Sequence, residues 1–178
     1  MPARALAEDR LRRFLLRRRR GSAEVEPPPI GRLLAETLDL AARLVSAGSG
    51  FIALNDPAQR AHGQPGTLTL VAAFGQDSER RVGQPLLRAG TTNDVEPAGE
   101  ALGGDDGLVD EAMSGGCTVL RPEAGREPAR IAVAVRLEHA VSGVLVFSAR
   151  RGRQLAARDV EIIELLARYV SRALLHAV

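Results

Sequence analysis

Few side chains in this sequence could carry out chemistry, and they do not gather into a recognisable site. The chain has one cysteine, Cys117, and three histidines, His62, His139 and His176, that lie far apart and share no motif. One thiol cannot form an intramolecular disulfide or a multi-cysteine metal site. We expect Cys117 to be a small residue of the core and each histidine to be solvated on a loop or a helix surface.

Carboxylates and paired glycines are the other candidates. Five acids crowd one irregular segment: Asp94, Glu96, Glu100, Asp105 and Asp106. They could hold a cation, but a solvated loop is the simpler interpretation. The pairs Gly103-Gly104 and Gly115-Gly116 lack the strand-to-helix setting and the lysine of a phosphate loop. The sequence therefore predicts no catalytic residue and no metal site, and we expect a protein that is not an enzyme.

Positive charge is concentrated at the N-terminus. Residues 1–20 hold eight arginines and two acids, a net charge of +6, whereas the other 158 residues hold 16 arginines and 20 acids, a net charge of −4. There is no lysine, and alanine and glycine are abundant, which is typical of a GC-rich bacterial genome. The body of the protein is therefore mildly acidic, and its N-terminus is strongly basic.

The basic segment, residues 1–20, has the spacing of an amphipathic helix, with Ala7, Leu11, Phe14 and Leu15 on one side. Its basic patch consists of Arg12, Arg13, Arg17, Arg18, Arg19 and Arg20. Three interpretations stay open. The helix could be solvated or packed on a protein partner as the stalk of a dimer. It could lie on a membrane surface, or residues 10–20 could contact the phosphates of a nucleic acid.

Three consecutive prolines, Pro27 to Pro29, cannot continue that helix, so residues 21–30 are predicted to be a linker before a domain at 31–178. No apolar run reaches the length of a membrane span. Leu15-Leu16 is too short for the core of a signal peptide. We expect a soluble cytoplasmic protein.

The domain has the pattern of an α+β fold. The spacing of apolar residues predicts helices at 31–46, 107–114 and from about 157 onward, and strands at 51–54, 67–74, 117–120, 131–137 and 141–148. Residues 47–50 are expected to stop the first helix. Residues 75–106 are irregular, with a short strand or helical turn near 85–87. The strands at 51–54 and 67–74 are expected to be antiparallel neighbours, and the last two strands form a hairpin.

The strand at 131–137 has two unlike faces. Its odd-numbered residues are large and aliphatic, and its other face carries Ala132, Ala134 and Arg136. The small alanines leave room for a ligand, and Arg136 could contact an anionic group or could equally be a solvated strand residue. We predict a ligand pocket over these three residues.

The first and last helices each have an apolar stripe wider than one sheet face needs. The extra positions are Leu33 and Leu40 in the first helix and Ile162, Leu165 and Tyr169 in the last. They could cover more of the sheet, but the sheet cannot bury both stripes of both helices. We predict that these five residues form the interface of a homodimer.

Residues 30–178 resemble a GAF domain. The resemblance rests on Gly107 to Val119, which looks like the family's short helix, glycine turn and strand, on Ser142-Gly143-Val144-Leu145-Val146, and on Arg158 to Ala167 in the closing helix. It implies an antiparallel sheet of five or six strands, with the N- and C-terminal helices packed on one face and any ligand on the other. GAF domains often dimerise through these helices, and their ligands vary widely.

The chemistry of known GAF versions finds little support in the residues. Cys117 lacks the following histidine often found where a tetrapyrrole is attached, and one cysteine cannot support sulfoxide reduction that needs a second thiol. The cyclic-nucleotide motif includes a lysine, which the chain lacks. We therefore expect a non-catalytic regulatory domain that homodimerises and signals to a protein partner or output domain. The alternatives are a small-ligand sensor and an adaptor using the basic N-terminus. No cofactor is predicted.

Overall fold

The structure, a computed structural model, describes residues 29–55, 68–75, 82–86, 107–137 and 140–176. The helices are α2 (Pro29–Leu44), α4 (Leu108–Gly115) and α5 (Ala157–His176), and the strands are β1 (Ala47–Asn55), β2 (Leu68–Phe74), β3 (Pro85–Leu86), β4 (Thr118–Arg121), β5 (Arg130–Leu137) and β6 (Ala140–Ala149). The predictions for the basic patch, the linker up to Pro28, His62, His139 and the acids of 94–106 lie outside the described residues.

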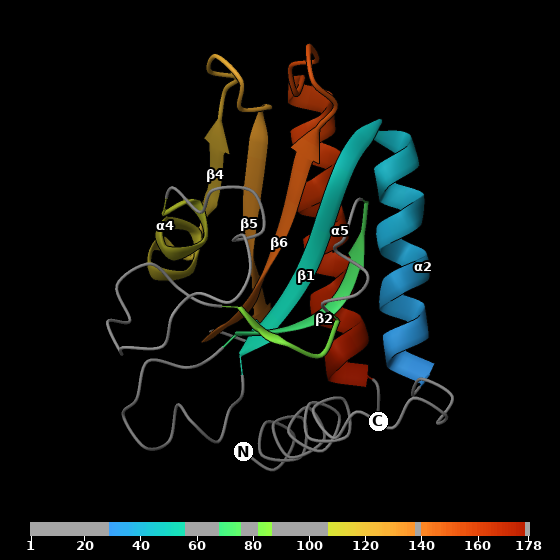
Figure 1. The fold of residues 1–178 in the computed structure, drawn as a ribbon. Helices are drawn as coiled ribbons and strands as arrows, with labels where there is room; N and C mark the ends of the chain where they lie inside the picture. The colour runs from blue at the N-terminus through green and yellow to red at the C-terminus, as the bar shows by residue number, and fades with distance from the viewer. Residues whose placement is uncertain (1–28, 56–67, 76–81, 87–106, 138–139, 177–178) are drawn as a thin grey trace.

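The six strands form one sheet in the order β3-β2-β1-β6-β5-β4, and every neighbouring pair is antiparallel. Strands β1 and β6 lie at its centre (Figure 1). The predicted pairing of β1 with β2 and the predicted β5–β6 hairpin are both confirmed. The predicted fold class, an α+β fold built on an antiparallel sheet, is also confirmed.

Helices α2 and α5 lie on one face of the sheet, and α4 lies on the other (Figure 1). Helix α2 packs on β1 and β2, and α5 packs on β5 beside α2. The two helices run antiparallel to each other. The expectation that the first and last helices of the domain share one face is therefore confirmed. None of the described helices has both the length and the apolar character needed to cross a membrane.

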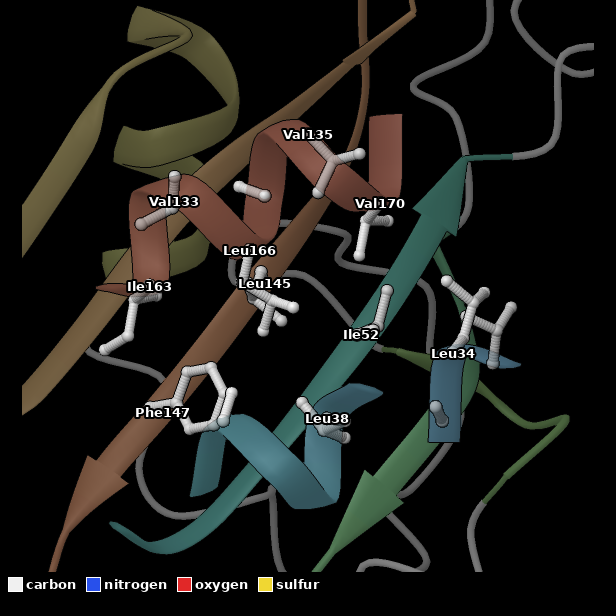
Figure 2. Packing of buried hydrophobic residues seen from close by; sticks show 14 of the residues in the cluster. Leu34, Leu38, Ile52, Val133, Val135, Leu145, Phe147, Ile163, Leu166 and Val170 are labelled. Atoms are coloured by element: carbon white, nitrogen blue, oxygen red, sulfur yellow. The ribbon is translucent and has the colours of Figure 1, made fainter. Parts of the chain in front are cut away.

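Each face of the sheet has its own apolar core, because successive side chains of a strand point to opposite faces. On the face beneath α2 and α5, Leu145 and Phe147 pack with Ile52 against residues from both helices (Figure 2). The helix residues that meet there include Leu34, Leu38, Ile163, Leu166 and Val170. The intervening residues Val144 and Val146 belong to the separate core beneath α4.

Strand β1 begins earlier than its sequence predicts. Residues 47–50 were expected to end the preceding helix, but Ala47 pairs with Ala149 and the strand continues from there. Gly50 lies where an added Cβ would approach Phe74 Cε1 to 2.6 Å and the Val146 carbonyl oxygen to 2.8 Å. This glycine permits close packing inside a strand rather than a turn, so the prediction of a helix stop over 47–50 was wrong.

Candidate functional site

Strand β5 divides its residues between the two faces as its pattern predicts. Ile131, Val133 and Val135 join the core beneath α2 and α5, and Ala132 joins the core beneath α4. Ala132 is fully buried, whereas Ala134 is half-buried. Of the three predicted pocket residues, Ala132 is therefore covered, and Ala134 and Arg136 are the ones that retain exposed surface.

Arg136 connects both layers that flank the sheet. Its guanidinium Nη2 donates a hydrogen bond to the carbonyl oxygen of Gly116, at the end of α4. Its backbone N–H donates to Ser171 Oγ of α5 at 3.3 Å. A bulge between Val135 and Arg136 in the β5–β6 ladder changes the register at this point. The side chain stays exposed, and a guanidinium has five N–H donors, so one bond to Gly116 does not exhaust it.

Gly116 ends α4 in a left-handed conformation, with φ of 57°. Its own N–H and that of Cys117 both point to the Ala112 carbonyl oxygen, as in the glycine caps common at helix ends. A Cβ at Gly116 would lie 2.5 Å from Arg136 Nη2 and 3.1 Å from Val141 Cγ2. Glycine is therefore required here both by the backbone conformation and by the Arg136 contact.

Helix α4 is held on the sheet by a short apolar face. Leu108, Val109 and Ala112 are buried over β4, β5 and β6, and Glu111 forms an ion pair with Arg121 of β4. At its N-terminus, Gly107 provides no side-chain cap. Few contacts and an uncapped start are consistent with an element whose local stability is low.

Asn55, at the end of β1, is a site residue that sequence reasoning missed. It is 8% exposed, and its Oδ1 atom is buried with no hydrogen-bond partner. Leaving a buried acceptor unpaired costs about 1–3 kcal/mol, and such groups are rare in native structures. The available signal was a polar residue ending the apolar run Phe51 to Leu54, but Asn55-Asp56-Pro57 has the composition of a turn and was interpreted as one.

The predicted interface residues lie on the outer surface of α2 and α5. Leu40 is 59% exposed, Leu165 is 62% exposed and Tyr169 is 47% exposed. Leu33 is half-buried, and Ile162 packs partly against the core. Leu44 is 60% exposed and lies one turn beyond Leu40. The structure therefore leaves most of this stripe uncovered.

Helix geometry brings the two stripes together. On α5, Glu164 accepts a hydrogen bond from Thr118 of β4, and Ser171 contacts Arg136 of β5, so this flank faces the β4 edge. Ile162 and Tyr169 lie on the opposite flank, towards α2. Because α2 and α5 run antiparallel on the same face, a two-fold axis perpendicular to the sheet relates them, and the flank of α2 that carries Leu33, Leu40 and Leu44 faces α5.

Cys117 lies at the surface, between the Gly116 cap and β4. The expectation that it belongs to the core was wrong, because the residue completes the turn after α4 instead of entering the sheet. Among the described residues, no group of histidine, cysteine and acidic side chains is arranged to hold a metal ion.

No model of a protein family matches the sequence, and no curated protein matches it. Solved structures do match. The GAF domain of a phosphoenolpyruvate-protein phosphotransferase from Acinetobacter has a TM-score of 0.60 at 18% identity, covering 95% of this chain and 92% of that chain. The second GAF domain of DevS from Mycobacterium smegmatis has a TM-score of 0.56 at 17% identity, covering 85% and 95%.

A free methionine-R-sulfoxide reductase from Neisseria meningitidis, solved with its substrate, also shares the fold. Its TM-score is 0.54 at 15% identity, and the match covers 90% of this chain and 86% of the reductase. At these identities the likeness is one of fold. The same backbone architecture therefore occurs in domains named GAF and in an enzyme, so function has to be argued from the residues.

Proposed function

Starting from the GAF fold of this chain, we propose that it is a non-catalytic regulatory domain that forms a homodimer through α2 and α5 and signals by protein contact. The observation that carries the proposal is the apolar helix surface, made of Leu33, Leu40, Leu44, Ile162, Leu165 and Tyr169. Single exposed apolar residues are ordinary, but a continuous group of them across two adjacent helices is typical of an interaction site.

A second copy of the chain is the occupant that fits this surface. In a two-fold interface the same patch meets itself, so a patch with strong net charge would repel its copy. On α2, Arg32 pairs with Glu36 and Arg43 pairs with Asp39, which leaves the helix neutral. On α5, three arginines balance three acids, with histidine taken as neutral: Arg158, Arg168 and Arg172 against Asp159, Glu161 and Glu164.

The cysteine content supports a non-catalytic role. In sulfoxide reduction by thiols, an oxidised cysteine is resolved by a second thiol. This chain has Cys117 alone, so the chemistry named for the reductase of the same fold has no intramolecular resolving partner here. Signalling by association needs no reacting group, only two states of an interface with different affinity for a partner.

The oligomeric state tests the proposal. Light scattering coupled to size exclusion should give twice the chain mass of 18.9 kDa for the wild-type protein. The double variant Leu165→Glu, Tyr169→Glu should give the monomer mass with an unchanged circular dichroism spectrum, because buried charges would face each other across the two-fold axis. Leu120→Glu is the matched control, since Leu120 is 45% exposed on β4 and away from the helix surface.

A monomeric wild-type protein would contradict the dimer. Loss of folding in the double variant, with Leu120→Glu intact, would instead mean that Leu165 and Tyr169 belong to the core. The basic patch of residues 12–20 stays a separate prediction. Binding to nucleic acid through it should weaken steeply as salt increases, whereas binding to uncharged lipid vesicles would favour a membrane-surface helix.

A further inference from the structure

We infer that the α4 face of the sheet binds a small carboxylate that also carries a carboxamide, with the carboxamide N–H bound by Asn55 Oδ1 and the carboxylate by Arg136. The inference does not depend on dimerisation, because α2 and α5 lie on the opposite face of the sheet. It names two groups, a buried acceptor without a partner and an exposed guanidinium with spare donors, at the same end of one sheet face.

The side chain of Asn55 points to the α4 face. Along β1, Ile52 and Leu54 join the core beneath α2 and α5, and Ala53 joins the core beneath α4. Alternation places Asn55 with Ala53. The cross-strand pair gives the same answer, since Asn55 pairs with Leu68, which belongs to the core beneath α4.

The known neighbours on this face cannot satisfy the amide oxygen. Ala53, Leu68 and Val144 offer only apolar side chains around it. An apolar residue would fill such a position without leaving an unpaired acceptor, so the asparagine has no structural benefit visible in the described part of the chain. Its oxygen needs a donor, and a charged ammonium would be poorly solvated among these groups. A neutral carboxamide supplies N–H donors and a C=O acceptor to complement both ends of the asparagine amide.

Arg136 lies at a matching level two strands away. Gly143 of β6 pairs with Leu54 on one side and with Val135 on the other. Asn55 and Arg136 are the next residues along β1 and β5, so they stand on either side of β6. Two strand spacings separate their backbones by about 10 Å. Guanidinium groups bind carboxylates through paired N–H donors, and Ala134 beside Arg136 leaves space above the sheet.

The test uses a series of probes with the intact chain. Adipic acid monoamide has the carboxamide and the carboxylate at the two ends of one flexible chain, hexanoate lacks the carboxamide, and hexanamide lacks the carboxylate. At saturation, the monoamide should raise the Tm by about 5 °C, and each truncated probe should give less than half of that shift. An equal shift with hexanoate, or no shift with the monoamide, would overturn the inference.

Two variants locate the effect. Asn55→Leu should abolish the shift given by the monoamide, and without probe its Tm should equal or exceed that of the wild type, because the unpaired acceptor is gone. Arg136→Gln should weaken binding of the monoamide at least tenfold in calorimetry and leave binding of hexanamide unchanged. Retention of the full shift by Asn55→Leu would refute the site. The Leu165→Glu, Tyr169→Glu variant should still bind, which separates this result from the dimer.

Discussion

The face beneath α2 and α5 and the face beneath α4 differ in where their unsatisfied surface lies. Under α2 and α5, the buried polar groups have partners. Thr69 has one, and Asp159 accepts a hydrogen bond from the Ala156 N–H at 2.9 Å. Under α4, Asn55 Oδ1 has none. On the outside the order reverses, because it is α2 and α5 that expose Leu40 and Leu165.

This difference separates two kinds of recognition in one small domain. An apolar surface outside a completed core is suited to association with another protein, whose area is large and whose contacts are mainly apolar at the centre. An unpaired polar atom inside a smaller core is suited to a small molecule, which is fixed by a few directed hydrogen bonds. The sheet between them is shared, so neither surface can be changed without bearing on the same strands.

The largest difference between the faces should appear in matched core truncations. Leu145→Ala removes a fully buried side chain of central strand β6, and Leu108→Ala removes one at the start of α4. We expect losses of about 4–5 kcal/mol and about 2–3 kcal/mol respectively, because the short helix can relax into its cavity and the sheet cannot. Urea unfolding with equal m-values measures both. Equal losses would mean that α4 is as rigid as the other layer.

The next effect concerns the end of α4. Gly116→Ala should lower the free energy of unfolding by about 2–3 kcal/mol, since it combines left-handed strain with displacement of Arg136. Gly125→Ala is the control, because Gly125 has φ of 60° with nothing within 4 Å of the added Cβ. It should lose only about 1 kcal/mol. If the two losses are the same, the Arg136 contact adds nothing to the α4 layer.

A smaller effect distinguishes the starts of the two helices. Asp159 is the third residue of α5 and accepts a hydrogen bond from the Ala156 N–H, whereas α4 begins at Gly107 without a side-chain cap. Asp159→Ala should therefore cost about 1 kcal/mol in thermal or urea unfolding. Asp159→Asn, which keeps an acceptor oxygen, should lose less. A neutral Asp159→Ala would show that the cap does not anchor α5.

The smallest effect is expected on the polar flank of α2. Arg43→Ala breaks an exposed ion pair with Asp39 one helical turn away, and such pairs contribute about 0.3–0.5 kcal/mol. The mass found by light scattering should not change either. Dissociation on Arg43→Ala would extend the interface beyond the apolar helix surface and would blur the contrast between the two flanks of this helix.

Elements with a long, regular apolar pattern could be predicted from the sequence. The alternation in β5 separated Ile131 from Ala132 correctly, and the wide stripes of the two long helices indicated surface that the sheet leaves uncovered. Both depend on local periodicity, which the chain carries within a single element. The face that each element covers followed from the same patterns.

Features set by contacts between distant segments could not be predicted. Gly50 has the composition of a turn, but its place in β1 is fixed by Phe74 and by Val146 of β6. The exposure of Cys117 depends on the turn that follows α4. Asn55 looked like a turn residue, and only its pairing with Leu68 places its side chain in a core. In each case burial depends on a partner far away in sequence.

The two hydrogen bonds of Arg136 make this one residue a spectroscopic probe of both layers. Its backbone amide proton is held by Ser171, so the rate at which it exchanges with deuterium follows the position of α5. Its guanidinium proton is held by the Gly116 carbonyl, so the chemical shift follows the end of α4. Selective arginine labelling would therefore monitor, in one sample, whether events at the dimer surface and at the opposite face occur together or independently.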